Sequence, residues 1–324
     1  MEENTEQRVD LTLFPEKIQE VKDRIASVIV GQEQTVDLVL TAILANGHVV
    51  IEGVPGVAKT LLARLAARLI DADFSRVQFT PDLMPSDVLG TTVFNMKTNG
   101  FDFHQGPIFA DIVLVDEINR APAKTQAALF EVMEERQISM DGTTYRMGDL
   151  YTILATQNPV EQEGTYKLPE AQLDRFLMKI TMDYPSLEEE VNILERHHTN
   201  AALVKLDDIV HAITKEELLS LRAFMNQEFV DSTLLQYIAM FVQQTRTSKA
   251  VYLGASPRAS VAMLQSSKAY ALLQGRDFVT PEDIKFVAPY VLQHRLILTA
   301  EAEMEGYSPV KVTQRLIDKV EVPK

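Results

Sequence analysis

The chain has 324 residues, of which 46% are hydrophobic and 24% charged, as in folded proteins long enough for two domains. It carries 31 lysines and arginines against 46 aspartates and glutamates, a formal net charge of −15. This excess of negative charge argues against a protein held on nucleic acid or on an anionic membrane mainly by general electrostatics. Cysteine is absent from the sequence, which excludes disulfides and thiolate metal sites.

We expect no targeting or membrane segment. The first six residues are acidic and polar, unlike the basic start and apolar core of a signal peptide. The longest uncharged run, residues 38–51, is broken by Asn46-Gly47 and is too short to span a bilayer. The prediction is a cytoplasmic protein without membrane insertion.

Helices and strands alternate over the first 185 residues. The first twelve residues are expected to fray, and helices are predicted over residues 15–27 and 36–44. Short apolar runs predict buried strands at residues 48–51, 76–79, 112–115, 152–155 and 176–182, with helices such as 122–135 between several of them. This alternation predicts an α/β fold with a parallel five-stranded sheet covered by helices on both faces.

Two segments interrupt this alternation. Residues 90–103 and 137–147 each carry alternating β-formers around an Asn-Gly or Asp-Gly pair, a strong signal for a hairpin turn. We interpret both segments as β-hairpin inserts in the α/β core.

The pattern becomes helical after Tyr184-Pro185. Helices are predicted over residues 186–197, 215–229, 232–245, 257–273 and 281–298, with no convincing strand among them. Ser256-Pro257 and Thr280-Pro281 mark two helix starts, each a capping residue followed by proline. We predict an α/β domain of residues 1–185 and an all-α domain of residues 186–324, in which the stretch after residue 306 shows no clear pattern.

Residues 53–60, GVPGVAKT, join the strand predicted at 48–51 to a helical stretch. They follow G-x-x-x-x-G-K-[ST], the loop whose backbone N–H groups surround the β-phosphate of a nucleotide. Lys59 would reach the β- and γ-phosphates, and Thr60 would offer its hydroxyl to Mg²⁺. Ala58 replaces the expected glycine, and alanine is the smallest substitute and tolerates a helical backbone. The alternative is a Gly/Pro turn that binds nothing.

Three polar residues follow the predicted central strands. Asp116 and Glu117 end the apolar run 112–115, and in a buried parallel sheet that end of a strand lies at the ligand crevice. Asp116 would hold Mg²⁺, Glu117 would take a proton from the water attacking the γ-phosphate, and Asn158 would orient that water. The alternatives are a solvated acidic turn for the two carboxylates and a simple turn start at Asn158-Pro159.

Two arginines are candidates for stabilising the charge that develops in phosphoryl transfer. Arg175 lies just before the last predicted strand, in LDRF, and Arg258 lies in the first turn of a predicted helix, in SPRA. The alternative for each is a solvated or ion-paired surface residue.

Five motifs, in this order, make the chain resemble a MoxR-family AAA+ ATPase, of the clade that includes magnesium-chelatase subunits and MCM-type helicases. They are GVPGVAKT at 53–60, VDEINRAP at 115–122, ATQNP at 155–159, LPEAQLDRF at 168–176 and GASPRA at 254–259. Ala58 is itself similar to the MoxR pattern. The resemblance covers residues 10–310 and implies an AAA+ P-loop core with two hairpin inserts and a helical lid.

The resemblance implies a role for each candidate. Walker B is Asp116 and Glu117, sensor 1 is Asn158, and sensor 2 is Arg258, whose action in its own or a neighbouring site stays open. Arg175 is the arginine finger for the neighbouring subunit, with Arg120 as second choice. Nucleotide contacts are implied for Walker A and for the segment near adenine: Val30, Gly31, Gly53, Val54, Pro55, Gly56, Val57, Ala58, Lys59, Thr60 and Leu61.

The function implied by the resemblance is an ATPase that uses ATP and Mg²⁺. It would work as a homo-oligomeric ring, expected to be a hexamer, and remodel a protein client, often one with a von Willebrand factor A domain, in complex assembly or metal-cofactor insertion. A nucleic-acid motor is disfavoured by the net charge of −15 and by hairpins without a basic cluster. A nucleotide-gated scaffold with little turnover is disfavoured because Glu117, Asn158 and Arg175 are all present. A P-loop kinase or GTPase fits worst, since we see no Asn-Lys-x-Asp motif.

Overall fold

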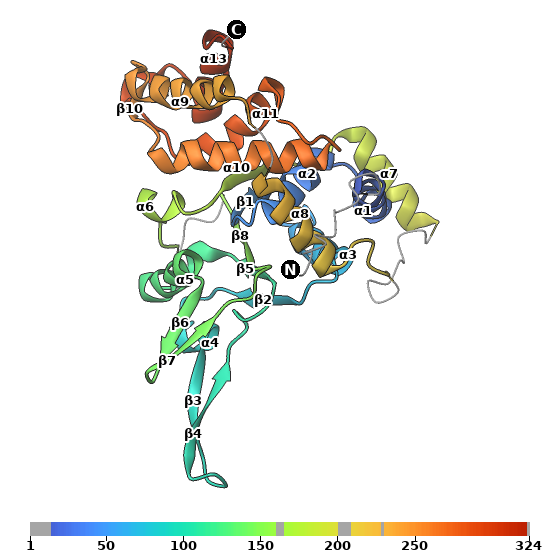
Figure 1. Cartoon of the computed structure of the whole chain (residues 1–324), viewed down its shortest axis with the longest axis vertical. Helices are drawn as coiled ribbons and strands as arrows, with labels where there is room; N and C mark the ends of the chain where they lie inside the picture. The colour runs from blue at the N-terminus through green and yellow to red at the C-terminus, as the bar shows by residue number, and fades with distance from the viewer. Residues whose placement is uncertain (1–13, 160–164, 200–208, 228–229, 323–324) are drawn as a thin grey trace, which may run out of the picture.

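The computed structural model describes residues 14–159, 165–199, 209–227 and 230–322. Figure 1 shows a central sheet with helices around it, a block of helices on one side and a long hairpin projecting from the other. The fraying expected for the first twelve residues lies outside the described residues.

The central sheet has five parallel strands in the order β2-β5-β8-β1-β9. The strands are β1 (Val49–Gly53), β2 (Phe74–Gln78), β5 (Ile112–Asp116), β8 (Thr152–Gln157) and β9 (Met178–Met182). All five residues of β5 are buried, as expected for a parallel strand covered on both faces. The predicted sheet is confirmed, with strand ends displaced by at most two residues.

Two hydrophobic clusters cover the two faces of the sheet. Ile112 and Leu114 pack in one cluster with the helices α1 (Phe14–Val28), α2 (Glu33–Leu44) and α3 (Lys59–Leu69). Val113 and Val115 belong to the other cluster, with α5 (Ala123–Glu135) and the short helix α4 (Pro85–Leu89). Because side chains alternate along a strand, a wholly apolar run such as β5 supplies both clusters at once.

Both predicted hairpins are present. They are formed by β3 (Gly90–Asn95) with β4 (Gly100–Gln105), and by β6 (Gln137–Met140) with β7 (Thr143–Arg146). Asp141 and Gly142 turn the second hairpin with φ values of 50° and 80°, the left-handed pair that a two-residue hairpin loop requires. The ring centroids of Phe103 and Tyr145 lie 4.5 Å apart and the Thr92 hydroxyl donates to Asp141 at 2.6 Å, so the second hairpin packs against the first.

After residue 185, the part of the chain that the structure describes is helical apart from one short pair of strands. Its helices are α7 (Leu187–His198), α8 (Lys215–Gln227), α9 (Ser232–Thr247), α10 (Pro257–Leu273), α11 (Pro281–Leu292), α12 (Ala300–Met304) and α13 (Pro309–Lys319). The strands β10 (Val251–Leu253) and β11 (Ile297–Leu298) form a short antiparallel pair that the sequence analysis did not expect. The helix predicted over 281–298 therefore ends at Leu292, and α13 occupies the stretch that showed no pattern.

Helix α7 lies beside α1, apart from the block formed by α9, α10 and α11 (Figure 1). Arg196 of α7 donates hydrogen bonds to the carbonyl oxygens of Ala26 and Ser27 near the end of α1, both at 2.9 Å. The domain boundary at residue 185 stays a prediction. Among the described residues, no helix combines the length and the apolar character needed to cross a membrane.

Two histidines are buried at the amino edge of the sheet. His48 precedes β1; its Nδ1 accepts a hydrogen bond from the Ile153 N–H at 3.0 Å, and its Nε2 lies 3.1 Å from the Met133 carbonyl oxygen. Burial, aided by the charge of Arg136, lowers the pKa of His48 from 6.5 to about 3. Burial also lowers the pKa of His294, whose Nε2 lies 3.1 Å from the Phe176 carbonyl oxygen. Both rings are therefore neutral in the folded chain.

We predict that His48 makes the protein less stable as the pH falls below about 6.5, because the unfolded chain binds a proton that the folded chain excludes. The free energy of unfolding should lose up to about 1.4 kcal/mol per pH unit from this residue between about pH 6.5 and the folded-state pKa of about 3. Urea unfolding at pH 5 to 8 should show a shallower pH dependence for His48→Gln, whereas the exposed His104→Gln keeps the wild-type slope. Equal slopes in all three proteins would contradict the prediction.

Candidate nucleotide site

The predicted phosphate loop and the predicted catalytic side chains meet at the carboxyl edge of the sheet. In the register of the strands, Val115 lies beside Ala155 and Glu52 lies beside Gln157. Asp116 therefore ends β5, and Glu117 and Asn158 follow β5 and β8, at the level where the loop leaves β1. The structure brings these residues together as the sequence analysis expected.

The loop enters α3 through a strained residue. Ala58 precedes the helix with φ 63° and ψ 22°, a left-handed conformation. The earlier explanation, that alanine is tolerated here because it suits a helical backbone, is wrong. A left-handed alanine costs about 1–2 kcal/mol relative to its preferred conformations. Such strain is typical of functional loops that the surrounding structure holds in place.

Lys59 points into its own loop. Its ammonium group contacts the carbonyl oxygen of Gly53 and donates to that of Val54 at 3.0 Å. Partial burial lowers the pKa of Lys59, and the negative charges of Asp116 and Glu117 oppose that shift. The ammonium therefore lies among loop carbonyls and near two carboxylates, so an incoming phosphate would find a cation at the place where it is needed.

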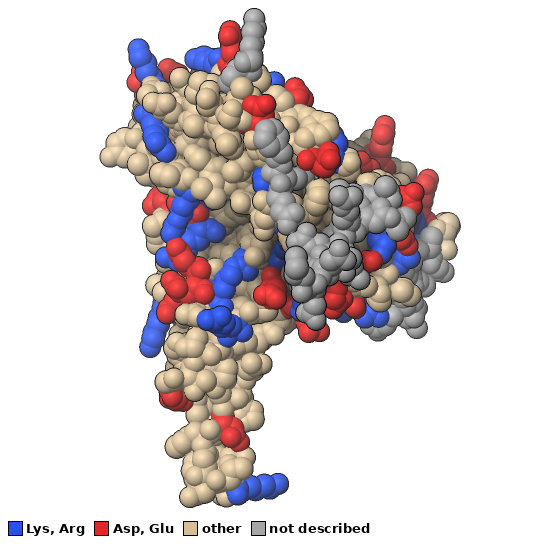
Figure 2. Space-filling model, in the orientation of Figure 1, with Lys and Arg blue, Asp and Glu red and all other residues tan. Residues whose placement is uncertain are grey.

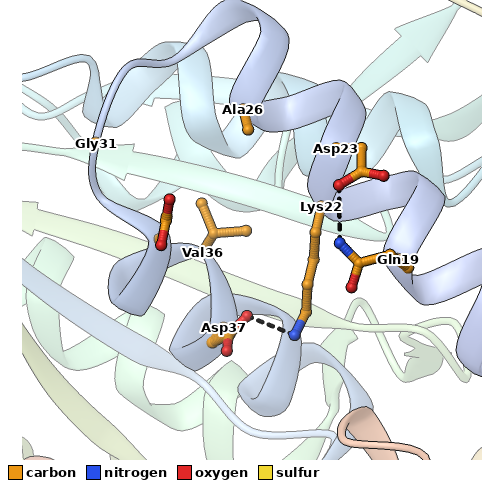
Figure 3. Close-up of a pocket in the computed structure, with 8 residues that line it drawn as sticks. Gln19, Lys22, Asp23, Ala26, Gly31, Val36 and Asp37 are labelled. Carbon is orange, nitrogen blue, oxygen red and sulfur yellow. Dashed lines mark hydrogen bonds and ion pairs between the residues drawn. The ribbon is translucent and has the colours of Figure 1, made fainter.

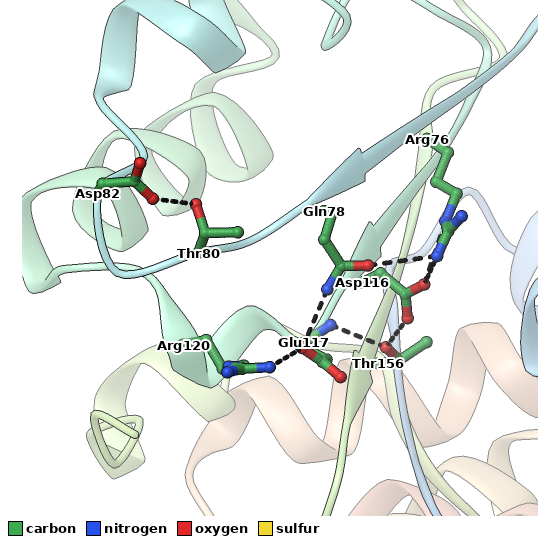
Figure 4. Close-up of polar contacts among 8 residues, drawn as sticks. All are labelled: Arg76, Gln78, Thr80, Asp82, Asp116, Glu117, Arg120 and Thr156. Atoms are coloured by element: carbon green, nitrogen blue, oxygen red, sulfur yellow. Dashed lines mark hydrogen bonds and ion pairs between the residues drawn. The ribbon is translucent and has the colours of Figure 1, made fainter. Parts of the chain in front are cut away.

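Asp116 is buried and both of its oxygens have partners (Figure 4). Oδ1 accepts a hydrogen bond from the Thr156 hydroxyl at 2.5 Å. Oδ2 accepts from the Arg76 guanidinium, at 3.1 Å from Nε and 2.7 Å from Nη2. The position beside Oδ2 thus already accommodates a positive charge.

Glu117 is held by three neighbours. Its backbone is left-handed, with φ 57° and ψ 52°, and its N–H donates to the Thr156 hydroxyl at 2.9 Å. Its Oε2 accepts from Gln78 at 3.0 Å and from Arg120 at 2.8 Å, as Figure 4 shows. Arg120, the second choice for an arginine finger, thus contacts the Walker B glutamate of its own chain. These contacts hold the Glu117 carboxylate in one orientation at the carboxyl edge of the sheet.

The oxygen donors at this edge fit Mg²⁺. Asp116 offers a carboxylate that is 8% exposed and faces a cation, and Thr60 stands next to Lys59 with a hydroxyl group. Among the described residues, no group of three or more His, Cys, Asp or Glu side chains forms a metal cage. Mg²⁺ usually binds through one or two carboxylates together with substrate phosphates, so a nucleotide would complete this site.

A cavity of about 220 Å³ adjoins the loop. It is lined by Val30 and by loop residues 56–58, and on the other side by Ile193 and Arg196 of α7. Its apolar walls beside the phosphate loop suit a nucleotide base. Gly31 is not among its lining residues: it packs against α7, where a β-carbon at this position would lie 2.1 Å from the Glu189 carboxylate.

A second cavity of about 280 Å³ lies between α1 and α2 (Figure 3). Lys22 pairs there with Asp37 at 2.8 Å, and Gln19 donates to Asp23 at 2.8 Å. These polar groups satisfy one another, and no residue of the phosphate loop lines this cavity.

Arg175 and Arg258 lie at the opposite, amino edge of the sheet. Arg175 precedes β9, whose Met178 pairs with Val49, the first residue of β1. The five residues of β1 place this edge roughly 16 Å from the phosphate loop. Within the described residues, neither arginine contacts the loop of its own chain.

The two arginines share one partner. Glu134 at the end of α5 forms an ion pair with Arg175 through Oε2 and accepts from Arg258 through Oε1, the latter at 2.5 Å. Arg175 also donates to the carbonyl oxygen of Phe130 at 3.1 Å. Both arginines line an open cavity of about 510 Å³. The structure therefore presents them together on one surface.

The sequence analysis missed several residues of these two clusters. Side chains two residues apart in a strand point to the same face. Arg76 and Gln78 are two apart, as are Thr156 and Asn158, so this spacing could have indicated Arg76, Gln78 and Thr156 as neighbours of the site. Glu134 offered no such signal, because its contact with Arg258 joins residues 124 positions apart.

Comparison with known proteins agrees with this architecture. A family model described as the ATPase family associated with various cellular activities (AAA) matches residues 48–178, and an AAA lid domain matches residues 243–318. A crystal structure from Cytophaga hutchinsonii, of a candidate ATPase, superposes with a TM-score of 0.88 at 40% identity and covers 97% of each chain. Fold and site define an AAA+ ATPase with a lid.

The relatives narrow the assignment. Chaperone MoxR1 of Mycobacterium tuberculosis is 43% identical over 309 residues, covering 93% of this chain and 81% of the relative. Protein MoxR of Methylorubrum extorquens is 33% identical over 313 residues, covering 86% and 87%. The uncharacterized protein YeaC of Bacillus subtilis is 46% identical over 301 residues and 93% of both chains. The chain belongs to the MoxR family of AAA+ ATPases, which confirms the resemblance and the predicted fold class.

We predict that Arg76 competes with Mg²⁺ for Asp116. In Arg76→Gln the Mg²⁺ concentration that half-saturates binding of a fluorescent ATP analogue should fall about threefold, since a partly exposed ion pair is worth up to about 1 kcal/mol. Arg146→Gln, an exposed change on β7, serves as the control and should leave the Mg²⁺ requirement unchanged. A higher Mg²⁺ requirement in Arg76→Gln would mean that the arginine supports the cation site.

Proposed function

We propose that this MoxR-family protein hydrolyses ATP at sites completed between subunits of a homo-oligomeric, hexameric ring, and that it uses this energy to remodel a protein client. The observation that carries the proposal is the placement of the phosphate loop and of the Arg175–Arg258 pair on opposite edges of one sheet. A single chain cannot bring the two edges to one nucleotide, whereas the arginine edge of a neighbouring copy can approach the loop edge of the next.

Each residue at the loop edge then has a role. The backbone of residues 53–60 surrounds the phosphates of ATP, with Lys59 on the β- and γ-phosphates. Thr60 and Asp116 would hold Mg²⁺, which neutralises phosphate charge when bound. Glu117 accepts the proton of the attacking water, and Asn158 orients that water.

The arginine edge supplies positive charge in trans. Arg175 stabilises the charge that develops on the transferred phosphoryl group, and Arg258 acts beside it because both arginines share Glu134. In this proposal the γ-phosphate of the neighbouring ATP takes the place of the Glu134 carboxylate as the anion that the two guanidinium groups bind.

A protein client is favoured over nucleic acid. The relative from M. tuberculosis is named a chaperone, and the family resemblance points to clients that often carry a von Willebrand factor A domain. Figure 2 shows few lysines and arginines on the projecting hairpin β3–β4, where a nucleic-acid motor would need them. Stimulation of ATP hydrolysis by DNA or RNA would favour the motor instead.

The ATPase rate per subunit, measured against protein concentration with Mg²⁺ and saturating ATP, tests the proposal. We expect a specific activity that rises with concentration and then levels off as rings form. A constant, appreciable rate from a species that sizing shows to be monomeric would overturn the shared site. Absence of turnover at every concentration, with or without client, would favour a nucleotide-gated scaffold.

We predict that Arg175→Ala binds ATP with near wild-type affinity and hydrolyses it at least about 10³-fold more slowly, the usual effect of removing an arginine finger. ATP binding is retained because Arg175 lies at the other edge of its own sheet. Arg315→Ala, which removes an exposed arginine of α13, is the matched control and should keep its rate. A wild-type rate in Arg175→Ala would remove this residue from the mechanism.

A second substitution tests Glu117 as the general base that accepts the proton of the attacking water. Glu117→Gln should retain ATP without hydrolysing it, with a rate lower by about 10²- to 10⁴-fold, because an amide cannot accept the proton. Bound nucleotide recovered after gel filtration should be ATP in this variant and ADP in the wild type. Glu135→Gln changes an exposed glutamate at the far end of α5, away from Glu117, and should turn over normally. Steady turnover by Glu117→Gln would assign the base elsewhere.

A further inference from the structure

Arg295, which follows α11 in the lid, donates all five of its N–H groups to hydrogen bonds. Nε donates to the Asp174 carboxylate at 2.7 Å, and Nη2 donates to the carbonyl oxygens of Asp174 and Phe176 at 3.0 and 2.6 Å. Nη1 donates to the carbonyl oxygens of Leu177 and Val291 at 3.1 and 2.5 Å. Four of the five bonds thus end on residues 174–177, the segment that contains Arg175.

The same aspartate reaches the helix that carries Arg258. Asp174 Oδ2 accepts a hydrogen bond at 3.0 Å from the hydroxyl of Ser256, the residue before α10. A serine at this position normally bonds an N–H of its own helix. In the described part of the chain the Ser256 hydroxyl makes no such capping bond, because it points to Asp174 instead. One carboxylate therefore joins the loop of Arg175 to the start of the Arg258 helix.

We propose that Arg295 and Asp174 are positioning residues that hold Arg175 and Arg258 as one unit for the neighbouring subunit. The inference rests on the proposed function, in which both arginines act in trans. Arg295 fixes the backbone on both sides of Arg175, and Asp174 ties that backbone to α10. Arg295 and Asp174 thereby couple the surface that carries Arg175 and Arg258 to the lid.

Simple docking of the lid on the core is the competing explanation. The Arg295 side chain is only 3% exposed, and burying a cation costs free energy that an apolar contact of the same size would not. A planar guanidinium that uses all of its N–H donors fixes the orientation and the distance of the groups that it binds, in addition to holding them in contact. Geometry of this kind matters most for groups that must meet a transition state, where a displacement of about 1 Å can lower a rate about 100-fold.

A complementation experiment in mixed rings tests the proposal. Arg175→Ala subunits keep an intact ATP site but offer no finger, and Lys59→Ala subunits offer the finger but cannot hydrolyse ATP. Rings made by co-expressing the two, each with its own affinity tag, should regain ATPase activity. Arg295→Lys is then added to one subunit type at a time, because lysine keeps the charge and loses the five-donor geometry.

We expect a directional loss. With Arg295→Lys in the Lys59→Ala subunit, which supplies the arginines, the regained rate should fall about tenfold. With Arg295→Lys in the Arg175→Ala subunit, which supplies only the ATP site, the rate should not change. Arg276→Lys is the matched control, since Arg276 pairs with Asp283 inside the lid at 2.5–2.7 Å, and it should have no effect in either subunit.

Other outcomes would overturn the inference. An equal loss from both placements would show a structural role only, and no loss from either would show no role. Mixed rings that regain no activity even with Arg295 intact would instead defeat the trans arrangement itself. Ser256→Ala provides a milder variant for the case in which Arg295→Lys does not fold: it breaks only the link to α10, and its loss should again be confined to the arginine-supplying subunit.

Discussion

The parallel direction of all five strands is the constraint on which the rest of the structure depends. Parallel strands give a sheet two chemically different edges, one with every carboxyl end and one with every amino end. The carboxyl edge collects the phosphate loop, Asp116, Glu117 and Asn158, each of which ends or follows a strand. The amino edge collects Arg175 and, through the lid, Arg258. Within the described residues, α1–α3 and α5 bury both faces of the sheet, so these polar side chains lie at its edges.

The charged side chains at both edges have partners within the chain. Lys59 contacts loop carbonyls, Asp116 pairs with Arg76, Glu117 pairs with Arg120, and Glu134 holds Arg175 and Arg258. Asp116 is the buried charge among them, and burying a charge without a partner is costly, so its pairing with Arg76 stabilises the folded chain. Binding of ATP and assembly of a ring would exchange them for contacts with phosphate. The free-energy change of each step is then the difference between the pairings that are lost and the contacts with phosphate that are gained. Such an exchange can be reversed.

Much of the fold could be predicted from the sequence because the signals for strands, turns and helix starts are local. Apolar runs such as 112–115 specify buried strands, Asp141-Gly142 specifies a tight turn, and Ser256-Pro257 marks a helix start. The loop-edge residues could be predicted for the same reason, since each follows a strand. The pair β10–β11 was missed because strands of two or three residues show no alternation. Glu134 and Arg295 were missed because their partners lie far away in the chain, and the left-handed backbone of Ala58 reflects the loop rather than alanine's own preference.

The opposite placement of the two edges restricts the symmetry of any assembly that shares its sites. A twofold dimer can complete both of its sites only if one continuous surface carries the loop edge and the arginine edge, because each edge must then meet the other edge of the partner at the same time. Head-to-tail contacts complete one site at each interface, and a linear row of copies then ends in one loop without arginines and one arginine pair without a nucleotide. Closing the row into a ring removes both incomplete ends. The number of copies that closes it then depends on the angle between the two contact surfaces of one subunit.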